Sequence, residues 1–256
     1  MSRRGDVCSL AGRQTSSVTT TLDPNRLGAA ESSWRTMLVA TGAVLGVTLL
    51  AAIGVAVVLI SAPQPLALLP EVIAAGLAVH ALGCLGALGA IFKATGVTAR
   101  SLGVTRPSWR LLHLAWQVPA TIVAAVGMQA LVAALIAGGE VTGGRRLDTA
   151  IHGAQPGVLI VAVLGIAVLT PLWEELYFRG LLQARITQRW GTLAAVIATA
   201  VIFAAVHGYL ILVPYYLVLG FALSGLRVFH RSLWGALVLH VTVNSIASAV
   251  LVTSLR

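Results

Sequence analysis

Apolar runs of about 20 residues recur along this chain, and its charged residues are confined to the segments between them. A helix of that length crosses a hydrocarbon layer about 30 Å thick. Of the 256 residues, 58% are hydrophobic and only 10% are charged, whereas roughly a quarter are charged in a soluble domain. The pattern predicts an all-α fold, a polytopic transmembrane helical bundle. Its expected spans are, approximately, residues 36–60, 71–94, 111–137, 157–179, 192–208, 210–229 and 232–253.

The distribution of Lys and Arg predicts how these spans are oriented. With the N-terminus placed in the cytoplasm, 14 of the 17 basic residues fall in segments predicted to be cytoplasmic, and only Arg145, Arg146 and Arg256 fall outside. The net charge of +9 is therefore interpreted as a topology signal. The basic residues do not form one amphipathic face, so nucleic acid is not an expected partner.

Composition divides the chain into three parts. Residues 1–34 are rich in Arg, Ser and Thr, and we expect a disordered cytoplasmic tail there. Residues 35–154 would contain the first three spans and a long external loop, and residues 155–253 a helical catalytic core. The two cysteines, Cys8 and Cys84, have neither metal-ligand nor redox spacing.

Ionisable side chains are costly in hydrocarbon, so they mark candidate functional residues, and most of them lie in the last four spans. Glu174 and Glu175 are adjacent in the fourth span, and Arg179 follows Glu175 by one helical turn. That spacing favours a structural ion pair between Glu175 and Arg179. Glu174 would then be free to act as a general base.

Three further candidates are expected near Glu174. His207 lies 33 residues after it, with the midpoint of that interval at a predicted turn at Trp190 and Gly191, so both residues should lie at similar depth. Phe203, one turn before His207, is placed to form a wall of the site. His240 and Asn244 are four residues apart and should project from one face of the last span. The other histidines are assigned to packing, interface or loop positions.

These residues also form three ordered motifs: E-E-x-x-x-R from Glu174, F-x-x-x-H from Phe203 and H-x-x-x-N from His240. In this respect residues 155–250 resemble the CPBP (Abi) family of intramembrane proteases, which includes type 2 CAAX prenyl proteases and bacteriocin-immunity proteins. The resemblance implies about eight helices, against the seven spans drawn above, which makes the expected count seven to eight.

The resemblance further implies an endopeptidase in which Glu174 and His207 activate water while His240 and Asn244 stabilise the oxyanion. Glu175, Arg179 and Phe203 would support them. No cofactor is favoured. A zinc enzyme with Glu174, His207 and His240 as ligands is the alternative, because two histidines and a glutamate with an open position are an acceptable catalytic zinc site.

A peptidase predicts a peptide or protein substrate in or at the cell membrane, and a water-filled cavity open to the cytoplasmic side that joins Glu174, His207 and His240 in one hydrogen-bond network. Two other functions remain open. A proton-coupled transporter also places Glu and His near midplane, although the sequence has no evident inverted repeat. A non-catalytic immunity or scaffold protein would require no convergent polar cluster.

Overall fold

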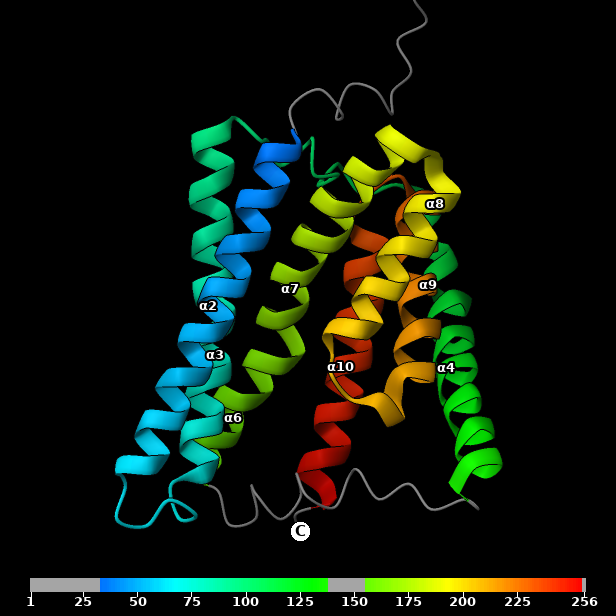
Figure 1. Cartoon of the computed structure of the whole chain (residues 1–256). Helices are drawn as coiled ribbons and strands as arrows, with labels where there is room; N and C mark the ends of the chain where they lie inside the picture. The colour runs from blue at the N-terminus through cyan, green and yellow to red at the C-terminus, as the bar shows by residue number, and fades with distance from the viewer. Residues whose placement is uncertain (1–32, 138–154, 255–256) are drawn as a thin grey trace, which may run out of the picture.

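A computed structural model describes residues 33–137 and 155–254, and these residues form an antiparallel bundle of helices without strands (Figure 1). The all-α prediction is confirmed. The predicted tail at 1–34 and most of the predicted external loop lie outside the described residues.

The first part of the bundle contains three long helices. The side chain of Ser33 caps the first of them by accepting a hydrogen bond from the Thr36 N–H. The second ends at Gly96, whose φ of 74° suits a glycine. A short 3-10 turn, η1, precedes the third. The elements are α2 (Trp34–Ser61), α3 (Leu69–Thr95), η1 (Trp109–His113) and α4 (Leu114–Ala137).

The second part begins with one rod in which α-helical and π-helical segments alternate, and it lies between the α2–α3 pair and the remaining helices (Figure 1). The rod contains α6 (Pro156–Leu164), η2 (Gly165–Leu169), α7 (Thr170–Glu174) and η3 (Glu175–Leu182). After it come α8 (Gln183–Val206), η4 (Leu210–Leu212), α9 (Val213–His230) and α10 (Trp234–Ser254). Gly191 interrupts α8 with φ 83° and ψ 170°, which confirms the predicted turn.

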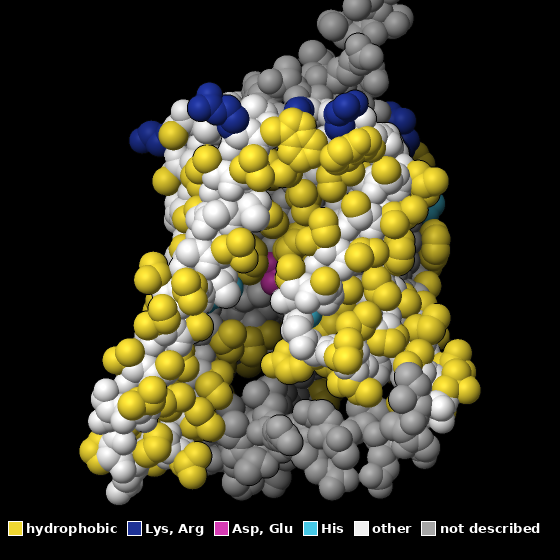
Figure 2. All heavy atoms as spheres, in the orientation of Figure 1, with side chains coloured by type: hydrophobic (Ala, Val, Ile, Leu, Met, Phe, Trp, Pro, Cys, Tyr) yellow, Lys and Arg dark blue, Asp and Glu magenta, His cyan; other side chains and the backbone are white. Residues whose placement is uncertain are grey.

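Five helical stretches among the described residues are long and apolar enough to cross a membrane, and a shorter apolar helix spans Trp234–Val250. The longest stretch, Pro156–Val206, contains the turn at Gly191 and therefore both spans predicted for this part. On the face drawn in Figure 2, Lys and Arg gather at one end of the bundle and hydrophobic side chains cover the rest. The chain is thus a multi-pass membrane protein. The exact number of spans and the cytoplasmic location of the basic end stay predictions.

Candidate active site

Glu174 and Glu175 lie where the rod changes from α7 to the π-helical η3. In a π-helix each N–H bonds to the carbonyl five residues back, so the segment holds an extra residue per turn. The Gln183 N–H accordingly donates to the Phe178 carbonyl at the end of η3. Single π turns inside α-helices are frequent at functional sites. Both carboxyl groups are buried inside the bundle.

Glu175 forms the predicted pair with Arg179. Arg179 Nη1 donates to Glu175 Oε1 at 3.0 Å, and the two side chains are 0% and 1% exposed. The guanidinium carbon of Arg179 also lies 4.3 Å from the centre of the Phe203 ring, a cation–π contact. A buried ion pair is costly to break because the remaining charge is left without a partner. This pair therefore fixes the segment that follows Glu174.

His240 joins both carboxyl groups. Its Nδ1 lies 2.8 Å from Glu175 Oε1, and its Nε2 lies 3.6 Å from Glu174 Oε2. The sequence predicted that His240 would approach Glu174, but the contact with Glu175 was not foreseen. The Glu175 carboxylate is itself held in place by Arg179. It therefore orients the imidazole of His240 in the same way as the carboxylate partners of catalytic histidines do.

His207 is held by groups on its own helix and on α9. Its Nδ1 lies 2.6 Å from the Phe203 carbonyl oxygen, and its ring stacks on Tyr216 with the centroids 4.0 Å apart. A carbonyl can only accept, so Nδ1 carries the proton and Nε2 of the neutral ring is free to accept one. Tyr216 is a site residue that the sequence analysis missed, because no pattern in α9 marks its tertiary contact.

Phe203 brings the two histidines close to each other. The centre of its ring lies 4.5 Å from that of His207 and 5.7 Å from that of His240. The ring thus forms the predicted wall. Within the described part of the chain, no hydrogen bond or ion pair joins His207 directly to Glu174. The expected single network of Glu174, His207 and His240 is therefore present only in part.

Asn244 lies one turn after His240 on α10, but the two side chains bind different groups. Asn244 Nδ2 donates to the Ile166 carbonyl at 2.9 Å, whereas His240 faces the two glutamates. The sequence placed both on one face of the helix. It could not indicate that one of the two N–H bonds of the Asn244 amide is already used by the backbone of η2.

The first part of the chain contributes a second polar cluster next to the site. His80 Nε2 lies 2.9 Å from Thr48 Oγ1 and 3.5 Å from Cys84 Sγ. The His80 ring also packs edge-on against Trp173, the residue before Glu174, with centroids 5.5 Å apart. This agrees with the packing role assigned to His80, and Cys84 belongs to the same cluster.

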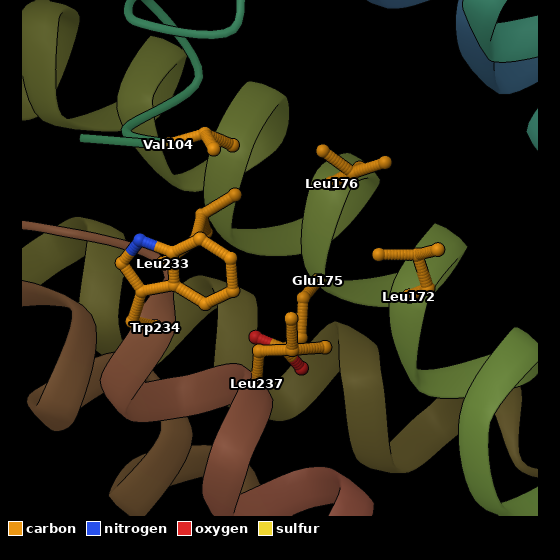
Figure 3. Close-up of a pocket in the computed structure, with 7 residues that line it drawn as sticks. All are labelled: Val104, Leu172, Glu175, Leu176, Leu233, Trp234 and Leu237. Atoms are coloured by element: carbon orange, nitrogen blue, oxygen red, sulfur yellow. The ribbon is translucent and has the colours of Figure 1, made fainter. Parts of the chain in front are cut away.

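The space around the carboxylates has two parts. Figure 2 shows a hollow between the α2–α3 pair and the α8 side of the bundle, with an acidic side chain at its inner end. On that face the hollow extends away from the Lys/Arg end. The side of the membrane to which it opens stays a prediction. Figure 3 shows a smaller cavity of about 70 Å³, lined by Glu175 and otherwise by apolar or aromatic side chains.

The zinc alternative requires that three ligand side chains converge on one point. Among the described residues, no group of three or more His, Cys, Asp or Glu side chains is arranged to hold a metal ion. Zinc bonds to nitrogen and oxygen are about 2.0–2.2 Å long, which places two ligands of one tetrahedral ion about 3.4 Å apart. The 3.6 Å between Glu174 Oε2 and His240 Nε2 is an ion-pair distance that is close to this separation.

Comparison with known families identifies the second part of the chain. Residues 156–246 match the model of a family described as Rce1-like, type II CAAX prenyl endopeptidase Rce1-like. The predicted resemblance is confirmed: this segment is Rce1-like. No curated protein and no solved structure matches the chain.

The Rce1-like segment contains α6 to α9 and most of α10, and hence all seven candidate site residues. The family indicates a CAAX intramembrane protease, and with it a peptide or protein substrate at the membrane. Helices α2, α3 and α4 lie outside the match. Their assignment to the same catalytic unit depends on their packing against the rod, such as the Tyr177–Thr41 hydrogen bond of 2.7 Å.

Proposed function

We propose that this Rce1-like protein is an intramembrane endopeptidase of the cell membrane that hydrolyses a peptide bond with water activated by Glu174 and His207. The observation that carries the proposal is the buried position of Glu174 beside His240, next to a second carboxylate already neutralised by Arg179. Glu175 and Arg179 balance each other, so Glu174 is the carboxylate that can exchange a proton with a substrate or water.

His207 supports this assignment through its tautomer. With the Nδ1 proton committed to the Phe203 carbonyl, Nε2 accepts a hydrogen bond. A water molecule between Nε2 and the Glu174 carboxylate would donate one hydrogen bond to each. That water would attack the substrate carbonyl, transfer a proton to Glu174, and leave a tetrahedral intermediate with negative charge on its oxygen.

His240 and Asn244 would stabilise that oxygen. The Glu175 carboxylate accepts from His240 Nδ1, so a proton on Nε2 gives an imidazolium whose Nε2–H can donate to the oxyanion. The second N–H of the Asn244 amide, the one not used by Ile166, would be the other donor.

Cleavage of a peptide by purified full-length protein in detergent tests the proposal. The panel contains a quenched fluorescent CAAX-type peptide with and without a prenyl group, because the family description names that substrate class. Glu174→Gln should abolish cleavage, because glutamine cannot accept the proton from water. Glu71→Gln, in the first turn of α3, is the matched control and should cleave like the unaltered protein. Equal cleavage by the Glu174→Gln variant would refute the assignment.

Addition of a strong chelator separates the glutamic from the zinc-dependent mechanism. A glutamic peptidase keeps its activity, whereas a zinc enzyme loses it and regains it when zinc is added back. A proton-coupled transporter would instead show Glu174-dependent proton uptake in vesicles and no cleavage, and a scaffold would show neither.

A further inference from the structure

The carbonyl of Ile166 has no donor from its own helix. In an α-helix it would accept from the Thr170 N–H, but in the π turn η2 that N–H donates to the Gly165 carbonyl, five residues back. The next candidate donor is residue 171, and proline has no N–H. A backbone carbonyl left without a donor inside a membrane costs several kcal/mol by transfer estimates.

Asn244 supplies the missing donor from a different helix. Its Nδ2 lies 2.9 Å from the Ile166 oxygen, and Asn244 comes from α10, 78 residues further along the chain. The side chain thereby replaces a backbone hydrogen bond that the combination of a π turn and Pro171 removes. This contact is separate from those that His240 makes one turn earlier on α10.

We propose that Asn244 is a positioning residue that holds the π turn η2 and thereby sets the direction in which α7 presents Glu174. Successive residues on an α-helix are rotated by about 100°. Loss of the extra residue in η2 would rotate α7 by about that angle and turn Glu174 away from His240. This role for the first Asn244 N–H is compatible with the oxyanion role proposed for the second, but its direct test does not depend on peptidase activity.

A double-mutant cycle of Asn244→Ala with Pro171→Ala tests the hydrogen bond. Alanine at position 171 restores a backbone N–H, so Ile166 gains a donor from its own helix whether the turn stays π-helical or returns to α-helical. The measurement is the thermal midpoint of unfolding of the full chain in detergent. Asn244→Ala should lower the midpoint by several degrees alone and by less than half as much in the Pro171→Ala background. Equal losses in both backgrounds would overturn the proposal.

Gln129→Ala is the matched control for the cycle. Gln129 Nε2 also donates to a backbone carbonyl, that of Ile211, at 2.9 Å. It joins α4 to η4 and has no contact with η2, so its loss should be the same with Pro171 or alanine. If Pro171→Ala itself prevents folding, Pro171→Ser restores the same N–H and replaces it in the cycle.

A substrate-free measurement distinguishes positioning from mere stabilisation. The infrared carboxyl band of Glu174 is identified by its disappearance in Glu174→Gln. In Asn244→Ala this band should shift, since the carboxyl group loses its place beside His240, whereas in Gln129→Ala it should not. An unshifted band in Asn244→Ala would show that Asn244 does not position Glu174, even where the peptide-cleavage experiment supports the proposed function.

Discussion

The two parts of this bundle solve the problem of polar groups in a membrane differently. In α2 and α3, hydroxyls such as those of Thr41, Thr48 and Thr95 donate to the carbonyl four residues back in the same helix. In the Rce1-like part, a buried acid, a guanidinium and an imidazole bind one another across helices. Thr41 and Thr48 also contact other helices, through Tyr177 and His80, but these groups are neutral hydrogen-bonding partners. The second part instead buries ionisable groups, each of which depends on a partner from another turn or helix.

The largest expected effect is on Glu174 itself. Glu174→Gln keeps the volume of the side chain but removes the proton acceptor, and we expect peptide cleavage to fall by about a thousandfold. The rate is measured with the fluorescent peptide at fixed protein concentration, and folding is compared by thermal unfolding. A fall of less than tenfold would mean that the network of polar groups across helices stabilises the fold and that Glu174 is not the catalytic base.

The second effect is on stability. Arg179→Met removes the guanidinium and leaves the buried Glu175 carboxylate with His240 but without its cationic partner, so the free energy of unfolding should fall by about 3–5 kcal/mol. The double variant Glu175→Gln with Arg179→Met removes both charges and should lose less than Arg179→Met alone. Reversible unfolding in mixed micelles measures both. A larger loss in the double variant would show that Glu175 contributes mainly through His240.

Phe203 should have an intermediate effect. Phe203→Leu removes the ring under Arg179 and between the two histidines, which should cost about 1–2 kcal/mol of stability. Cleavage should fall about tenfold, because the orientation of His207 and His240 is less restricted. Phe221→Leu on α9 is the control, since that side chain is 41% exposed and lies outside the site. If the two variants lost stability and cleavage to the same extent, Phe203 would not orient the histidines.

The sequence predicted those features that depend on spacing along one helix. The apolar runs located the spans, Gly191 located the turn, and the four-residue spacing of Glu175 and Arg179 predicted their ion pair. Each of these depends on helical geometry alone, which residue spacing determines.

The sequence could not predict contacts that depend on how helices are rotated about their axes. Two π turns change the direction of the rod before and after Glu174, and with it the partners of His240. Pro171 was the available signal, because a proline inside an apolar span removes a backbone donor. Its consequence, the use of Asn244 by the Ile166 carbonyl, follows only from the packing of α10 against η2.

The smallest expected effect lies in the first part of the bundle. It tests directly whether the polar groups of α2 and α3 differ in role from those of the Rce1-like part. The Thr48 hydroxyl donates to the Val44 carbonyl, so it accepts from His80 Nε2. Thr48→Val removes that acceptor and should cost about 0.6 kcal/mol, the average for a side-chain hydrogen bond in a membrane. Cleavage should stay within twofold of the unaltered protein. His80 packs on Trp173, so a tenfold fall in cleavage with unchanged stability would instead extend the active site into α2 and α3.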